Sequence, residues 1–351
     1  MDKVRAFVKR YQIISFFLLT YLITWGFWIP FIGPATRGTS TFAEIFATWG
    51  IFGPAFAGII ITQLITSGDF DINRKKPILA FCFALVLSAL ILVLNISMSI
   101  GSSLTIARMI ILFLFSLLVA IPPAFIFSSA FSRNHGVRDY LRSLIKPRGP
   151  VIYYLIALLL PPLMYWLGTL MSDALGQASY YAPPPLTGLD AIRVISITFL
   201  YQFFYGNVLG EEVGWRGFAL PRLQARFSPV VASLVIALAW FPWHLPLKWG
   251  NPDVIPYLYH ALSFIPSSIL LTWIYNRTHG SILAVGIAHV MGNVSGKILF
   301  PITDSRLIIG FVVAIILIVT DRMWEKLAGV DSSNLLPGQE QGITIPPSNS
   351  A

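Results

Sequence analysis

Two adjacent carboxylates stand in one of the most apolar parts of the chain. Glu211 and Glu212 are followed by Arg216, and aromatic and aliphatic residues flank the group on both sides. Ionisable side chains at membrane depth are expensive, and by default they mark a functional site. Glu211 and Glu212 are therefore the first candidates for chemistry.

Spacing predicts different roles for the two carboxylates. Glu212 and Arg216 are four residues apart with the acid first, the order that favours an ion pair on one helix face. Glu211 points about 100° away on an ideal helix, so it has no counter-ion on its own helix. A carboxylate in that position suits a general base, which takes a proton from the attacking nucleophile.

Histidine and amide side chains recur further along the chain. His244 follows Trp240 by four residues, and Asn293 follows His289 by four. The second spacing puts an imidazole and an amide on one helix face, where both can donate hydrogen bonds to a developing oxyanion. His244 is a second candidate for proton transfer. We interpret His260 and His279 as structural.

The composition indicates a membrane protein. The 351 residues are 56% hydrophobic and 11% charged, whereas about a quarter of a soluble domain is charged. The single cysteine, Cys82, leaves no partner for a disulfide within the chain. Because apolar runs of about 20 residues recur along the chain, we predict an all-α, polytopic bundle of about ten (eight to ten) transmembrane helices. The predicted spans are residues 12–33, 44–67, 77–98, 106–131, 151–172, 196–220, 229–248, 255–275, 281–300 and 306–320.

The basic residues predict the orientation of these spans. The formal charge is +9, but 18 of the 24 Lys and Arg residues fall in the alternate segments that include both termini. Cytoplasmic loops carry an excess of Lys and Arg. This pattern predicts a multi-pass membrane protein with both termini in the cytoplasm, and it explains the charge without a nucleic-acid partner.

The candidate residues are predicted to lie at similar depth. With the basic loops as the inner boundary and a rise of 1.5 Å per residue, Glu211 lies about 16 Å into the membrane, His289 about 14 Å and Asn293 about 20 Å. His244 lies about 24 Å in, in a hydrocarbon core about 30 Å thick. The four side chains can therefore meet on three neighbouring helices.

In this order and spacing the motifs resemble a known family. The three motifs are Glu211-Glu212-x-x-x-Arg216, Trp240-x-x-x-His244 and His289-x-x-x-Asn293. They are similar to the signature of the CPBP intramembrane proteases, which include CAAX prenyl endopeptidases and ABI-domain proteins of the bacteriocin-processing type. The resemblance covers about residues 195–300 and is closest to bacterial and archaeal members, which implies a prokaryotic cell membrane. One departure is Trp240, where the family usually has phenylalanine.

The resemblance implies an intramembrane endopeptidase that acts on a membrane-associated protein or peptide. Glu211 and His244 would activate water, His289 and Asn293 would stabilise the oxyanion, and Glu212 with Arg216 would order the site. No cofactor is required by this mechanism. A divalent metal such as zinc stays open, because Glu211, His244 and His289 are acceptable ligands by type, although no His-Glu-x-x-His motif is present.

Two other classes of function stay open. The polar residues of the second half could form the proton relay of a proton-coupled transporter, or the chain could be a non-catalytic immunity or scaffold protein of the same fold. We divide the chain into N-terminal membrane helices without assigned function (1–190), a catalytic membrane domain (191–325) and a disordered C-terminal tail (326–351). The pattern predicts neither the natural substrate nor the oligomeric state.

Overall fold

The computed structural model describes residues 2–36, 41–66, 75–100, 105–250 and 255–327, and most of the predicted tail lies outside these ranges. All elements in the described ranges are helices, apart from one isolated bridge between Tyr181 and Ile302. This confirms the predicted all-α polytopic bundle. The elements of the first half are α1 (Asp2–Arg10), α2 (Gln12–Thr36), α3 (Thr41–Gly50), α4 (Gly53–Ile65), α5 (Lys75–Ile100), α6 (Ile106–Val119), α7 (Ile121–Ser129), α8 (His135–Ile145) and α9 (Ile152–Ala174).

The second half contains three π-helical segments in addition to α-helices. Its elements are α10 (Gly188–Tyr205), η1 (Asn207–Glu212), η2 (Trp215–Ala219), α11 (Leu220–Gln224), α12 (Pro229–Trp243), α13 (Leu245–Gly250), α14 (Tyr257–Arg277), α15 (Ile282–Val294), η3 (Ser295–Leu299) and α16 (Asp304–Thr320). Within the described ranges, seven helical spans are long and apolar enough to cross a membrane, and nine if each of two bent pairs counts as one span. The predicted number of eight to ten is consistent with this range.

Two predicted spans are bent. The span predicted at 44–67 consists of α3 and α4, which meet at 59°, and the span predicted at 106–131 consists of α6 and α7, which meet at 48°. Each second helix has proline in its first turn, at Pro54 and at Pro122-Pro123. A proline inside a helix removes one backbone hydrogen bond and clashes with the preceding turn, so the bend falls where the prolines are.

Two short helices, α1 and α8, lie outside every predicted span. Helix α8 lies in a segment whose basic residues predict a loop. Its 11 residues are too few to span a membrane. It forms because the Asn134 side chain caps its first turn by accepting from the Val137 amide at 3.0 Å. Val137, Tyr140 and Leu141 are buried on one face, so the helix packs against the bundle while its basic residues face outward.

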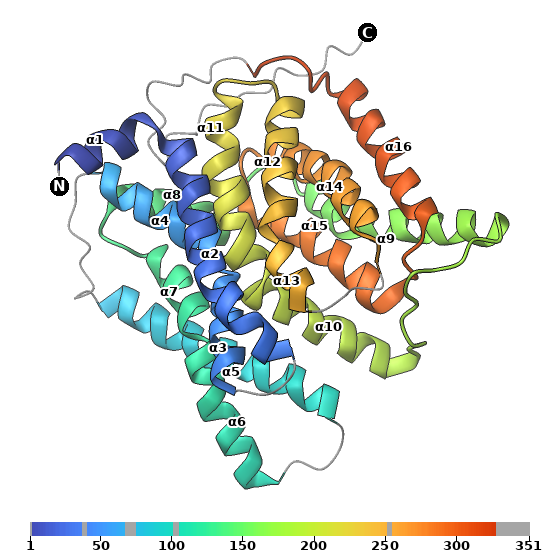
Figure 1. Cartoon of the computed structure of the whole chain (residues 1–351), viewed down its shortest axis with the longest axis horizontal. Coiled ribbons are helices and arrows are strands. Elements are labelled where there is room, and N and C mark those ends of the chain that lie inside the picture. Colours follow the sequence, from blue (N-terminus) through green and yellow to red (C-terminus); the bar gives the residue numbers. More distant parts are fainter. Residues whose placement is uncertain (1, 37–40, 67–74, 101–104, 251–254, 328–351) are drawn as a thin grey trace.

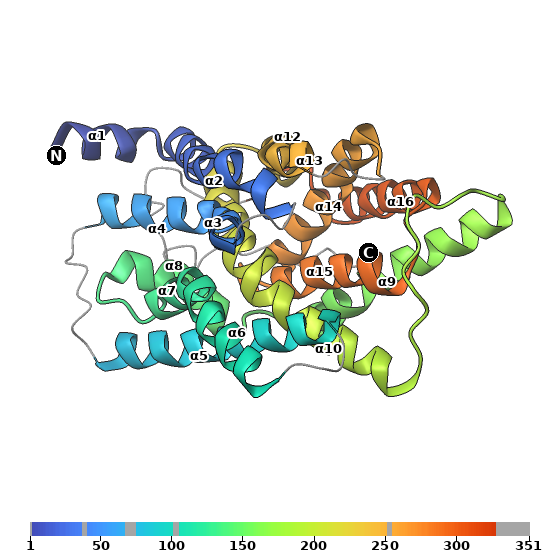
Figure 2. The ribbon, with the colours of Figure 1, turned by 60° about the horizontal axis from the view of Figure 1, so that its bottom comes forward.

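The helices form layers that place the first half against the second. Figure 2 shows α2 and α12 in one layer, α4 and α15 in the next, and α5 with α10 on the other side. Helix α2 lies along α12 and α13 (Figure 1). The Trp25 indole donates to the Trp243 carbonyl at 3.1 Å, and the Trp28 and Trp243 rings lie 4.6 Å apart. Helix α2 thus contacts the end of α12, next to His244.

Candidate active site

The two glutamates lie on a π-helical turn and not on the regular helix that the spacing predicts. Helix α10 ends at Tyr205, and η1 carries both Glu211 and Glu212. Single π-helical turns within helices are rare and occur frequently at functional sites. The irregular backbone alters the angular relation between the two carboxylates, but the predicted pair of Glu212 with Arg216 is present.

Glycines let the glutamate segment approach helix α4 at backbone distance. A Cβ atom on Gly210 would lie 2.7 Å from the Ile51 carbonyl oxygen, and one on Gly214 would collide with the Pro54 backbone. Any larger residue at these positions would push the segment away from α4. The Tyr140 hydroxyl of α8 also donates to the Val213 carbonyl, between the two glycines. Elements of the first half therefore set the position of both carboxylates.

Glu212 is the centre of a buried polar cluster. Arg216 Nη1 donates to Glu212 Oε1 at 2.9 Å, and both residues have no exposed surface. Nδ1 of His289 lies 2.6 Å from the same oxygen, and since a carboxylate only accepts, Nδ1 carries the hydrogen. Arg216 Nη2 also donates to Ser268 Oγ at 3.3 Å. Glu212 therefore fixes the side chains of both Arg216 and His289.

Glu211 has a different environment from its neighbour. The Trp240 indole donates to Oε2 at 2.6 Å, and the Asn207 amide donates to Oε1 at 3.2 Å. Nε2 of His244 lies 3.9 Å from Oε2. Glu211 is 2% exposed but lines the cavity, whereas Glu212 does not. The predicted difference between the two carboxylates is thus seen in their contacts: Glu212 is paired with a cation, and Glu211 faces the cavity.

His244 is oriented by the backbone at the end of α12. Its Nδ1 lies 2.9 Å from the Trp240 carbonyl oxygen, which can only accept, so Nδ1 carries a hydrogen. The other nitrogen, Nε2, is then the one directed at Glu211. The side chain is 18% exposed. Trp240 thus contacts both His244, through its carbonyl, and Glu211, through its indole.

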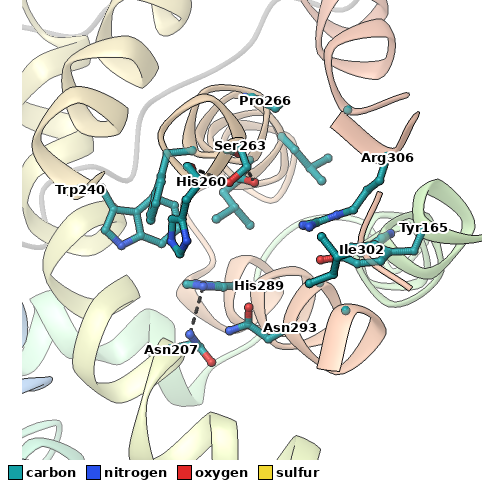
Figure 3. A pocket seen from close by; sticks show the side chains of 18 of the residues that line it. Tyr165, Asn207, Trp240, His260, Ser263, Pro266, His289, Asn293, Ile302 and Arg306 are labelled. Carbon is teal, nitrogen blue, oxygen red and sulfur yellow. Dashed lines mark hydrogen bonds between the residues drawn. The ribbon is translucent and has the colours of Figure 1, made fainter. Parts of the chain in front are cut away.

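Asn207 links the two predicted halves of the site and was not predicted. Its amide nitrogen lies 3.1 Å from Nε2 of His289 and 3.2 Å from Glu211 Oε1. Figure 3 shows Asn207, His289 and Asn293 close together on one side of the cavity. Asn293 lines the cavity. The sequence offered one indication of this role: Asn207 precedes Glu211 by four residues, a spacing that places both side chains on the same helix face.

The four residues predicted to be catalytic line a single cavity of about 420 Å³. Glu211, His244, His289 and Asn293 come from η1, the end of α12 and α15, as the estimates of depth predict. Glu212 and Arg216 lie behind the cavity wall. His260, which we interpreted as structural, also lines the cavity, where its ring stacks on Phe264 at 5.2 Å. Most of the other lining residues are apolar or aromatic.

The candidate metal ligands do not converge on one point. Among the described residues, no group of three or more His, Cys, Asp or Glu side chains could hold a metal ion. Nδ1 of His289 is turned to Glu212 and its Nε2 to Asn207, so neither nitrogen shares a centre with Glu211 and His244. The arrangement does not fit a metal ion bound by Glu211, His244 and His289 together. We therefore derive no chemical step through a metal.

The central segment of the chain is similar to known proteins. Residues 193–295 match the family described as "Type II CAAX prenyl endopeptidase Rce1-like". The chain is 31% identical over 131 residues to a protein of Methanococcus maripaludis named "CAAX prenyl protease 2"; the match covers 33% of this chain. It spans 48% of that relative, about half of its length. Residues 193–295 are thus similar to the Rce1-like CAAX prenyl endopeptidases.

Proposed function

We propose that the protein is an intramembrane endopeptidase that uses water activated by Glu211 and His244. The observation that carries this proposal is the cavity within the helical bundle onto which Glu211, His244, His289 and Asn293 all open. The family match supports it, because the same segment carries all four residues. Glu212 and Arg216 do not line the cavity, and their role in this proposal is to hold His289 in place.

The first step of the proposed reaction is attack by water. Nε2 of His244 and Oε2 of Glu211 are 3.9 Å apart, so one water molecule can lie within about 2.8 Å of both atoms. Glu211 takes a proton from this water while its oxygen forms a bond to the scissile carbonyl carbon. His244 accepts the second hydrogen bond of the water and so fixes its direction.

The second requirement is stabilisation of the tetrahedral oxyanion. Asn293 and His289 lie on one face of α15, beside the cavity (Figure 3). We assign Asn293 and His289 to the oxyanion site, with the Asn293 amide as the donor. Glu212, 2.6 Å from Nδ1 of His289, fixes the direction of that ring. When the carbon–nitrogen bond breaks, the proton held by Glu211 passes to the leaving amine, giving a carboxylic acid and an amine.

The proposed substrate is a membrane-associated protein or peptide. A relative is named a CAAX prenyl protease, so a prenylated peptide is the first substrate to test. The excess of basic residues in alternate loops supports an orientation with both termini in the cytoplasm of a prokaryotic cell. No metal is part of the proposed mechanism.

The experiment uses purified full-length protein in liposomes and a fluorogenic farnesylated peptide. We expect Glu211→Ala and His289→Ala each to abolish cleavage, while Glu44→Ala, at an exposed position on α3, cleaves at the wild-type rate. Size-exclusion profiles and melting curves establish that each variant is folded. A folded Glu211→Ala protein with wild-type activity would refute the assignment.

One observation favours proton transport as a second candidate function. Glu211, Asn207, His289, Glu212 and Arg216 form one continuous chain of polar contacts through the bundle. Such a chain could relay protons. Proton flux into the same liposomes that is lost in Glu211→Ala, without cleavage of any peptide, would favour the transporter over the protease.

A further inference from the structure

Two basic residues, Lys297 and Arg306, line the cavity in addition to Glu211, and Arg306 lies on the wall opposite the tryptophan. Arg306 of α16 lines the cavity together with Tyr165 of α9 and Tyr259 of α14. Figure 3 shows the Arg306 side chain reaching into the cavity from one side and Trp240 on the other, with His289 and Asn293 between them. Arg306 and Tyr165 lie outside the segment that matches the family, and the proposed mechanism uses neither.

The position of Arg306 is fixed by close packing. Its guanidinium carbon lies 3.8 Å from the centre of the Tyr165 ring, and its Nη1 donates to the Tyr259 hydroxyl at 3.3 Å. Helix α16 packs closely against α9: a Cβ added to Gly168 would lie only 2.8 Å from the Cα of Arg306. The guanidinium is thus oriented in advance of any ligand, which reduces the entropy lost on binding.

Within the described part of the chain, Arg306 has no carboxylate within ion-pair distance. Asp304 is two residues away on the same helix, where side chains do not face each other, and it accepts from the Tyr180 hydroxyl at 2.9 Å. Arg277 provides a contrast, because it is ion-paired with Asp321. Arg306 is half-buried and lines the cavity, so a ligand that brings an anion there would gain a charge-assisted hydrogen bond.

We propose that Arg306 binds a carboxylate of the peptide substrate, and this rests on the proposed protease function. The planar guanidinium binds carboxylates through two parallel hydrogen bonds, which gives both strength and direction. A cavity of about 420 Å³ takes a short peptide segment and no folded domain. The carboxylate therefore lies within a few residues of the scissile bond, either at the C-terminus of the substrate or on an acidic side chain.

The test compares three peptides that differ in the presence and the position of one carboxylate. Full-length protein in phosphatidylcholine liposomes is given a farnesylated peptide with a free C-terminal carboxylate, the same peptide as a C-terminal amide, and that amide with aspartate as its last residue. The variants are Arg306→Gln, Arg306→Lys and the control Arg277→Gln. Arg277 also lies near a tyrosine ring, Tyr153, but it does not line the cavity.

We expect the wild type to prefer a carboxylate-bearing peptide over the plain amide by about 10- to 100-fold in kcat/KM, the size of a charge-assisted hydrogen bond. The preference should appear mainly in KM. Arg306→Gln should lose it, Arg306→Lys should keep part of it, and Arg277→Gln should keep all of it. The peptide that is preferred identifies the source of the carboxylate.

Two results would overturn the assignment of Arg306. One is a wild type that cleaves the acids and the amide equally. The other is an Arg306→Gln variant that slows cleavage of all three peptides by the same factor, which is the behaviour of a purely structural residue. A wild type that cleaves none of the three peptides would instead refute the proposed protease function, and the two failures are thereby distinguished.

Discussion

Replacing Trp240 with phenylalanine tests how Glu211 is held. The indole N–H donates to Glu211 Oε2 at 2.6 Å, and the substitution removes this donor. A phenylalanine ring would still fill the space beneath the Arg216 guanidinium, 4.4 Å from the ring centre, and beside Phe264 at 4.8 Å. The main change is therefore the loss of one hydrogen bond to a buried carboxylate.

The expected magnitude follows from that single bond. A hydrogen bond to a charged group contributes about 1.5–3 kcal/mol, and about 1.4 kcal/mol corresponds to a tenfold change in rate. Asn207 still donates to the other oxygen of Glu211, so we expect the lower end of the range. Trp240→Phe should lower kcat/KM about tenfold on the fluorogenic peptide, mainly through kcat, because Glu211 must point at the water for every turnover.

Trp273→Phe is the matched control. Trp273 lies on the neighbouring helix α14, and its indole N–H is buried without a hydrogen-bond partner among the described residues. The same atoms are removed, but no bond to Glu211 is lost, so activity should stay within about twofold of the wild type. If Trp240→Phe is folded and as active as Trp273→Phe, the indole N–H does not position Glu211, and the reasoning is wrong.

Three further predictions concern the surroundings of Glu211. Glu212→Gln leaves Arg216 buried without its anion, so we expect a loss of about 3–5 kcal/mol in unfolding free energy, seen as a lower melting temperature; an unchanged melting curve would contradict this. Gly214→Ala drives a methyl group into Pro54 and should lower both stability and activity, whereas Gly26→Ala, with nothing within 4 Å of the added atom, should be tolerated. A zinc chelator should leave cleavage unchanged, and activity restored by added zinc after its loss would show that a metal is used.

Hydropathy predicts the fold well because the membrane imposes simple rules. Apolar length predicts the spans, and proline accounts for the bend before α7. The estimates of depth place Glu211, His244, His289 and Asn293 together because rise per residue is nearly constant in helices. None of these rules depends on which helices are neighbours, and so they work without knowledge of the packing.

The parts that were not predicted depend on packing between distant segments. The direction of the Trp240 indole follows from where η1 lies relative to α12, and the π-helical turns leave no pattern in the residue types. Arg306 and Tyr165 meet only because α9 and α16 touch. Helix α8 is too short for a hydropathy rule and is stabilised by its cap and its buried face.

The residues that line the cavity come from a wider stretch of chain than the four residues proposed to react. Glu211, His244, His289 and Asn293 fall within residues 193–295, whereas Arg306, Tyr165 and Ile51 line the cavity from outside that segment. Reaction and selectivity can therefore change independently during evolution. A relative that retains every reacting group could accept different substrates because its flanking helices differ, and alignments limited to the shared segment would not show the difference.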